Sequence, residues 1–108
     1  MLDKAWTLST LNGKPIEMPD GAKTPWLKVA GDQLSGFGGC NNLMGSFTLE
    51  GDRIGFPGLG STKMFCENTS AIERSFMDAL RSTDGYKLDG NLLKLMKGSA
   101  EVATMKAQ

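Results

Sequence analysis

The residue types that could do chemistry are concentrated in one stretch, GFGGCNNLMGSF, which covers residues 36–47. It combines four glycines, one of the two cysteines and two adjacent asparagines. Such a stretch could cradle a phosphate, carry a reactive thiol, or curve the main chain tightly within a sheet. These three hypotheses make different demands on the residues around it.

A phosphate loop is the first hypothesis, because Gly36-x-Gly38-Gly39 superficially resembles glycine-rich nucleotide loops. Those loops lead into a helix whose N-terminal amides face the phosphate. Here the chain continues as LMGSFTLE, which alternates apolar and polar residues with the period of a strand. We therefore expect no donors for an anion at this loop. GLGSTK, residues 58–63, lacks the leading glycine of a Walker motif and fails as well.

Reactive-cysteine chemistry is the second hypothesis. The chain has no histidine, which excludes serine or cysteine nucleophiles activated by histidine and zinc sites built on histidine. Two cysteines alone cannot complete a structural zinc site. Cys66 precedes a predicted helix, and Cys40 has no obvious activator. We expect no catalytic residue, no metal ligand and no cofactor, and hence no enzyme.

The third hypothesis is structural. Glycines inside strands mark bulges, sharp bends or close backbone approach, and asparagine bonds nearby main-chain groups in turns. Cys40 has one candidate partner, Cys66. A disulfide between them would contribute about 3 kcal/mol by the chain-entropy model, provided that the compartment is oxidising. The alternative is two buried thiols that behave as small apolar residues.

Strand patterns dominate the elements that must position these residues. Alternating residues and turn signals predict a strand over 5–13, a loop over 14–25, a hairpin over 26–37 turning at Gly31-Asp32, a hairpin over 43–56 turning at Gly51-Asp52, and three strands over 86–107. Turn signals at roughly ten-residue intervals suit an antiparallel meander or barrel.

One segment, residues 68–83, has helical spacing instead, with Ile72, Phe76, Ala79 and Leu80 on one face. Ser70 followed by Glu73 fits a capping box, and the alternative for Glu73 is a hydrogen bond at the buried edge of the helix. Asp84-Gly85 is predicted to end the helix. The expected fold class is thus α+β, an antiparallel sheet with one helix.

Bulk properties set the remaining limits. A chain of 108 residues is expected to be one domain, residues 1–108. Twelve basic and twelve acidic residues without a basic run favour neither nucleic acid nor an anionic membrane as partner. Seven methionines are many for this length, and we expect Met64, Met77 and Met96 to fill the core or line a groove.

Taken together, several blocks resemble the META/HslJ-like domain family: LNGKP at 11–15, GCNNLMGSF at 39–47, TKMFC at 62–66, and the helix with Glu73, Phe76 and Leu80. The matching positions are Gly39, Cys40, Asn41, Gly45, Thr62, Met64, Cys66 and Glu73. The family often has alanine before the second cysteine, where this chain has Phe65, and we expect that side chain to pack on the helix.

The resemblance implies a curved, incompletely closed antiparallel barrel with one helix packed across it. It also implies a bacterial cell-envelope protein, periplasmic or an outer-membrane lipoprotein, linked in some members to stress. We expect that a native targeting segment has been removed, and that any membrane contact would come through a lipid anchor on it. No enzymatic activity is established for the family.

Three functions therefore compete. The first is a non-catalytic envelope module that binds a protein or an apolar ligand. The second is a thiol–disulfide role for Cys40 and Cys66, which requires an exposed sulfur of low pKa. The third is a structural interaction domain that adds an exposed edge strand, residues 103–106, to the sheet of a partner.

Overall fold

The computed structural model describes residues 5–107, which form eleven strands and one helix. The elements in chain order are β1 (Ala5–Leu11), β2 (Lys14–Pro15), β3 (Trp26–Ala30), β4 (Gln33–Phe37), β5 (Asn42–Ser46), β6 (Thr48–Glu50), β7 (Arg53–Gly55), β8 (Gly60–Ser61), α1 (Ser70–Ser82), β9 (Gly85–Asp89), β10 (Leu92–Lys97) and β11 (Ala100–Ala107). This is the α+β class predicted from the sequence.

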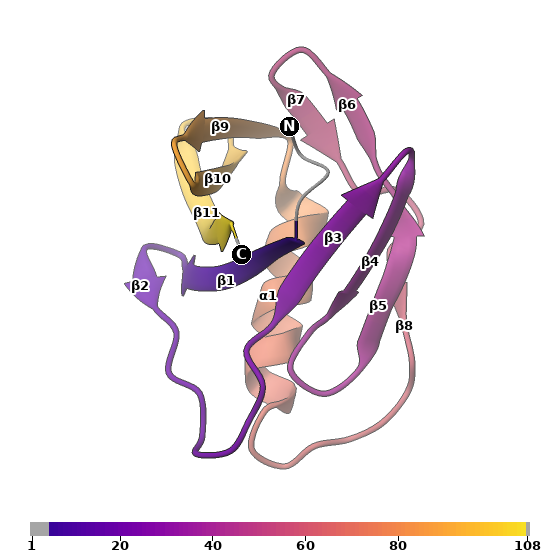
Figure 1. The fold of residues 1–108 in the computed structure, drawn as a ribbon, viewed down its shortest axis with the longest axis vertical. Coiled ribbons are helices and arrows are strands. Elements are labelled where there is room, and N and C mark those ends of the chain that lie inside the picture. Colours follow the sequence, from indigo (N-terminus) through magenta and orange to yellow (C-terminus); the bar gives the residue numbers. More distant parts are fainter. Residues whose placement is uncertain (1–4, 108) are drawn as a thin grey trace.

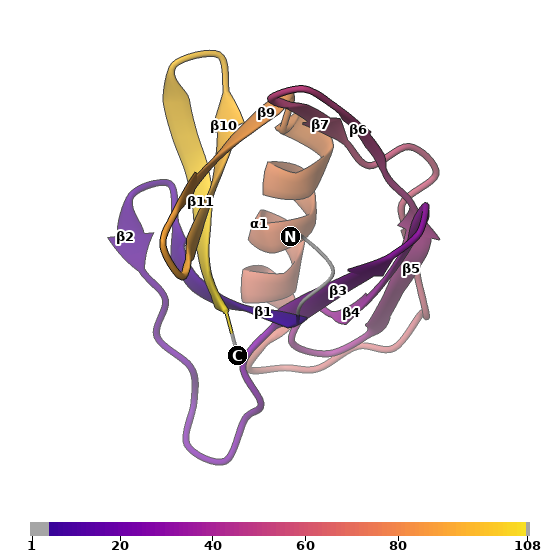
Figure 2. The same cartoon turned by 45° about the horizontal axis from the view of Figure 1, so that its top comes forward.

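The strands pair antiparallel in the order β6-β7-β9-β10-β11-β1-β3-β4-β5-β8, and β2 pairs with the end of β1. The sheet curls so strongly that the strands nearly encircle the interior, with α1 lying across it (Figures 1 and 2). The predicted incompletely closed barrel with one helix is confirmed.

Local signals placed most hairpins correctly. The β3–β4 hairpin turns at Gly31-Asp32 and the three C-terminal strands follow one another in the sheet. The predicted hairpin over 43–56 is wrong in its first half. The strand pairing is interrupted at Phe47, whose amide donates to the Asp32 carbonyl at 3.1 Å. As a result, β5 pairs with β4, and only β6 pairs with β7.

The expected edge strand at residues 103–106 is a second error. These residues lie in the middle of β11, which pairs with β10 on one side and β1 on the other. Thr104 is buried and its hydroxyl shares a 2.6 Å hydrogen bond with Thr10. Because both edges of β11 are occupied, this strand offers no backbone groups to a partner's sheet.

The helix buries one face against β1 and β11. Phe76 and Leu80 are fully enclosed, as the helical spacing predicts, while Ile72 is half-buried near the N-terminus. Of the three methionines considered for the core, Met77 and Met96 are buried and Met64 is exposed. Within residues 5–107, no helix combines the length and apolar character needed to cross a bilayer.

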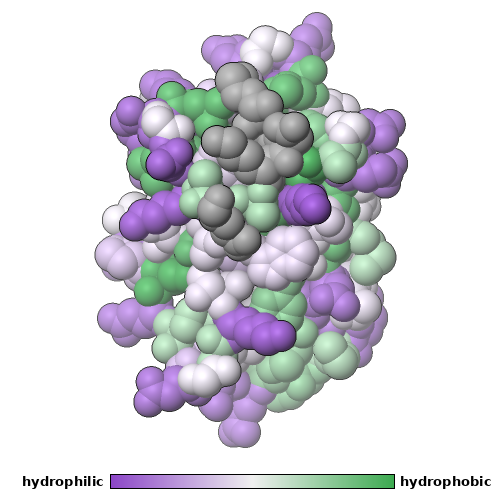
Figure 3. Space-filling view, viewed as in Figure 1, coloured by the Kyte–Doolittle hydropathy of each residue, from purple (hydrophilic) through white to green (hydrophobic). Residues whose placement is uncertain are grey.

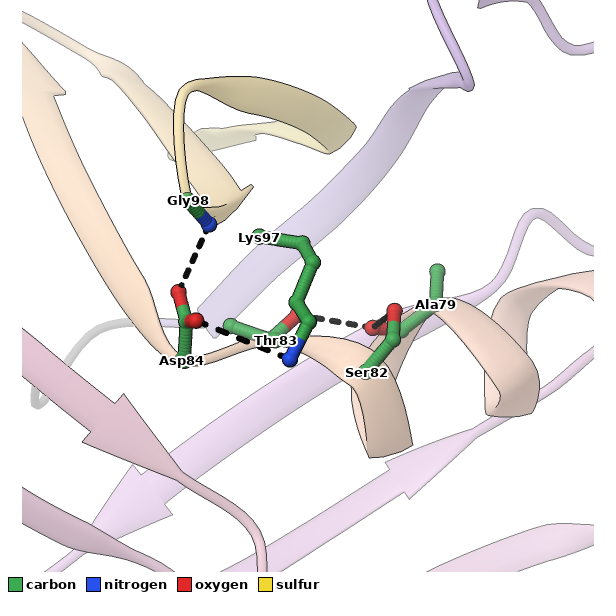
Figure 4. Close-up of polar contacts among 6 residues, drawn as sticks. All are labelled: Ala79, Ser82, Thr83, Asp84, Lys97 and Gly98. Carbon is green, nitrogen blue, oxygen red and sulfur yellow. Dashed lines mark hydrogen bonds and ion pairs between the residues drawn. The ribbon is translucent and has the colours of Figure 1, made fainter.

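The helix ends at Ser82, just before the predicted stop at Asp84-Gly85, but glycine is not its cap (Figure 4). Thr83 is the C-cap: its extended backbone turns the chain away, and its hydroxyl donates to the Ala79 carbonyl at 2.7 Å. Asp84 then accepts a 3.0 Å hydrogen bond from the Gly98 amide, which joins the start of β9 to the β10–β11 turn. A side chain therefore closes the helix here in place of a glycine.

The interior of the barrel is filled by apolar side chains. A void of about 20 Å³ is lined by Trp6, Leu27, Val29, Ile54, Phe56, Leu93, Leu95 and Met105. A space of this size is comparable to one water molecule, and its apolar lining offers water no hydrogen bond. At this place in the described part of the barrel, the space is too small for a lipid chain or another sizeable ligand.

Candidate functional site

The two cysteines form a disulfide, with Cα atoms 5.7 Å apart and a sequence separation of 26. This confirms the favoured structural hypothesis over two buried thiols. Cys40 lies in the connection between β4 and β5 and is buried, and Cys66 lies in the segment between β8 and α1. The bond therefore ties the segment before the helix to the turn between the two strands.

Asn41 holds the same segment by side-chain hydrogen bonds. Its Nδ2 donates to the Met64 carbonyl at 3.0 Å and to Glu73 Oε2 at 2.8 Å. Its Oδ1 accepts from the Met64 amide at 2.7 Å and from the Thr62 hydroxyl at 2.8 Å. A carboxamide has two donor hydrogens and two acceptor lone pairs, so all four positions of this side chain, which is 4% exposed, are occupied.

Glu73 approaches from the helix side of the same cluster. Its Oε1 accepts hydrogen bonds from the main-chain amides of Cys40, at 3.1 Å, and Asn41, at 2.5 Å. Its Oε2 accepts the bond from the Asn41 side chain. The carboxylate is 8% exposed, and three donors compensate for its removal from water.

The predicted capping box is therefore wrong, and the buried hydrogen bond that was its alternative is confirmed. Thr69 is the N-cap and makes no side-chain cap bond. The Ser70 hydroxyl accepts from the Cys66 amide at 3.0 Å. Glu73 points away from the helix start because two adjacent amides of the β4–β5 connection donate hydrogen bonds to its carboxylate.

This geometry also changes the interpretation of the glycine-rich stretch. The sequence predicts no anion donors there, yet the amides of Cys40 and Asn41 converge on one oxygen. Successive main-chain amides of this kind form an anion-binding concavity. The chain fills that concavity with its own carboxylate, Glu73, so the place that a phosphate would take is occupied from within.

Two glycines make this arrangement possible. Gly39 has φ of 119°, a conformation that side chains other than glycine rarely adopt. At Gly38, an added Cβ would lie 2.7 Å from Cγ and 2.8 Å from Oε1 of Glu73. Glycine is thus required at one position for the backbone angle and at the other for the approach of the helix carboxylate.

Replacing Gly38 by alanine is expected to lower the free energy of unfolding by about 2 kcal/mol, because three hydrogen bonds prevent Glu73 from moving aside. Urea denaturation of the oxidised protein measures the effect. Gly60→Ala is the matched control, since an added Cβ at Gly60 meets nothing within 4 Å. Equal stability of the two variants would contradict the tight fit described here.

The structure brings seven of the eight motif residues into one cluster: Gly39, Cys40, Asn41, Thr62, Met64, Cys66 and Glu73. Gly45 lies apart, in β5, where it allows the backbone of Gly58 to approach. Sequence reasoning missed two contributions, the approach at Gly38 and the bond from Cys66 to Ser70. Ser70 was misassigned because its spacing to Glu73 matches a capping box.

No group of three or more cysteine or acidic side chains that could hold a metal ion occurs in residues 5–107. In the same range, every buried side-chain nitrogen or oxygen has a hydrogen-bond partner. The motif cluster is thus a closed polar network whose hydrogen-bonding capacity is used internally.

Comparisons with known proteins concern the family and the fold. The family model for the META domain matches residues 1–108. No match was found among curated proteins. A protein from Burkholderia xenovorans whose structure was determined by NMR is similar over 98% of this chain and 82% of its own, with 27% identity and a TM-score of 0.77.

Two further solved structures share the fold. One, an NMR structure, aligns over 99% of this chain and 91% of its own at 22% identity and a TM-score of 0.76. The other is the crystal structure of a DUF4847 family protein from Bacteroides vulgatus ATCC 8482, with 16% identity, a TM-score of 0.67, and coverage of 98% of this chain and 92% of that chain.

Proposed function

This chain belongs to the META domain family, and on that premise we propose that it is a non-catalytic module of the bacterial cell envelope that binds a protein partner through its outer surface. One observation carries the proposal. Asn41 and Glu73 are the motif residues best suited to bind a substrate. Their side chains instead form hydrogen bonds within the protein that stabilise the fold. Recognition is therefore left to exposed side chains.

The filled interior supports a protein partner over an apolar small molecule. Ligand pockets in proteins typically enclose about 300–1,000 Å³, and the void inside this barrel is about 20 Å³. On the face seen in Figure 3, hydrophilic residues are spread among hydrophobic ones. The sequence has twelve basic and twelve acidic residues and contains no basic run. A surface of this kind suits contact with another protein more than attachment to a charged polymer.

The disulfide supports the envelope part of the proposal. Disulfides persist in oxidising compartments such as the bacterial periplasm and are rare in the cytosol. Cys40, in the connection between β4 and β5, is buried, so its sulfur is poorly placed for attack by an external thiolate. No specific contact therefore favours the thiol–disulfide role over a structural bond.

The test is photocrosslinking in living bacterial cells that express the protein. A photoreactive amino acid is placed at one exposed position at a time, on separate faces: Lys14, Leu49, Phe65 and Lys87. We expect a discrete adduct with one envelope protein from one face, and we expect heat shock to alter its amount if the role is linked to stress.

Absence of adducts from all four positions, before and after heat shock, would overturn the binding proposal. Adducts with cytosolic proteins alone would overturn the location. Adducts that appear equally from every face would indicate random collision and count against a defined surface.

A further inference from the structure

Phe65 contradicts the expectation that it packs on the helix. Its side chain is 80% exposed, and that of its neighbour Met64 is 60% exposed. These are the two most exposed large hydrophobic residues in the range 5–107. Leaving an aromatic side chain in water forgoes about 2 kcal/mol that burial would supply, so its position has no rationale in folding.

The backbone that presents Phe65 is anchored on both sides. Before it, the amide and the carbonyl of Met64 are both bonded to the Asn41 side chain. After it, Cys66 is held by the disulfide and by a hydrogen bond from its main-chain amide to the Ser70 hydroxyl. The segment has no regular secondary structure, yet its path is set by these anchors. Binding of a partner to Phe65 would therefore cost little conformational entropy of the backbone, as in preorganised interfaces.

A groove of about 270 Å³ runs beside these side chains, and we name it the Phe65 groove. It lies between the exposed segment and one face of α1, and it is lined by Met64, Phe65, Ser70, Glu73, Arg74, Met77 and Arg81. Methionine and aromatic side chains supply an adaptable apolar floor. The Glu73 carboxylate at its wall is already engaged by the amides of Cys40 and Asn41.

Two arginines give this groove its charge. Arg74 and Arg81 are exposed and seven residues apart on α1, which places them about 10 Å apart along the helix axis. Neither forms an ion pair within residues 5–107. Other charges nearby in sequence are Lys63, Glu67 and Asp78, all exposed. A groove lined by two arginines together with methionine and phenylalanine side chains is complementary to an apolar side chain flanked by carboxylates.

We propose that the Phe65 groove binds a short extended segment of a partner protein with the pattern Glu-Xaa-Leu-Xaa-Glu. In an extended chain, alternate side chains share a face, so the three named residues would point into the groove with the outer two roughly 13 Å apart. The glutamates are farther apart than the two arginine positions on the helix axis, and the long arginine side chains can extend to cover this difference. This inference deepens the proposed function and rests on it, because it names the chemistry of the partner.

The observations favour a peptide over a membrane surface. Anionic lipid is recognised by dense clusters of basic residues, about four to eight of them. This groove has two arginines, and the chain as a whole has twelve basic and twelve acidic residues. The guanidinium fork matches a carboxylate in two parallel hydrogen bonds, which rewards defined side chains of a protein.

The test is fluorescence anisotropy with a labelled peptide, Ser-Glu-Thr-Leu-Thr-Glu-Ser, titrated with the oxidised protein at low and moderate salt. We expect saturable binding that weakens with salt. Arg74→Ala, Arg81→Ala and Phe65→Ala are each expected to raise the Kd about tenfold, the loss of one charge-assisted pair or one aromatic contact. All three side chains are exposed, so these variants are expected to fold.

Matched controls lie on another face of the barrel. Arg53→Ala removes an exposed arginine from β7, and Leu49→Ala removes a side chain that is 45% exposed in β6. Both are expected to bind the peptide as the parent protein does. A peptide with glutamine in place of both glutamates is expected not to bind.

Three outcomes would overturn the inference. The first is no saturable binding of the glutamate peptide. The second is equal binding of the glutamine peptide or of the groove variants. The third is binding to phosphatidylglycerol vesicles, and not to the peptide, that depends on Arg74 and Arg81.

The two proposals fail separately. Photocrosslinks to an envelope protein from Lys14, Leu49 or Lys87 but none from Phe65 would leave the binding module in place and overturn the groove. Peptide binding with the expected variant pattern, but no crosslinks in cells, would support the groove and contradict the cellular role.

Discussion

Replacing Glu73 by alanine is expected to lower the free energy of unfolding by about 4 kcal/mol, the largest effect of any single substitution considered for this domain. The change leaves three buried N–H groups without an acceptor: the amides of Cys40 and Asn41 and one of the two Nδ2 hydrogens of Asn41, whose other hydrogen still bonds to the Met64 carbonyl. It also opens a space where the side chain lay against Gly38. Urea denaturation of the oxidised protein measures the loss.

Two comparison variants separate the causes. Glu67→Ala removes an exposed carboxylate just before the helix and is expected to change stability by less than about 0.5 kcal/mol. Glu73→Gln keeps an oxygen for the two main-chain amides but turns a second donor toward Asn41 Nδ2, so we expect an intermediate loss of about 2 kcal/mol. If Glu73→Ala and Glu67→Ala unfolded at the same urea concentration, the role assigned to the buried carboxylate would be wrong.

Removing the disulfide by the double change Cys40→Ala and Cys66→Ala is expected to lower the free energy of unfolding by about 3.5 kcal/mol. The 26-residue separation sets this magnitude, because the bond restricts a loop of that length in the unfolded chain. Thermal or urea unfolding with and without a reductant measures it. Reductant should destabilise the parent protein and leave the double variant unchanged.

The same bond provides the test of a redox role. A structural disulfide typically has a reduction potential below about −300 mV, and catalysts of exchange lie well above that value. A measured potential near −200 mV would contradict the structural assignment and favour thiol–disulfide exchange. Because the disulfide and Asn41 hold the same segment, adding Asn41→Ala to the double cysteine variant is expected to give a loss of stability that is not the sum of the separate losses.

Local patterns in the sequence determined most of the secondary structure and the family. Hairpin turns such as Gly31-Asp32 and the helical spacing of Phe76 and Leu80 depend on neighbours a few residues away. They can therefore be predicted from the sequence without the tertiary structure. The same holds for the helix over residues 70–82, whose predicted bounds differ only at the ends. The disulfide was also within reach, since Cys40 has one possible partner.

Tertiary structure alone decided what the motif residues do. Glu73 has a local partner in sequence, Ser70, but its carboxylate bonds to amides more than thirty residues away because the curled sheet brings the β4–β5 connection against the helix. The central place of β11 depends on the pairing order of the whole sheet. Exposure of Phe65 depends on anchors on either side, and apolar character by itself predicted burial. Contacts between distant segments are set by packing of the complete chain, which no local window of residues encodes.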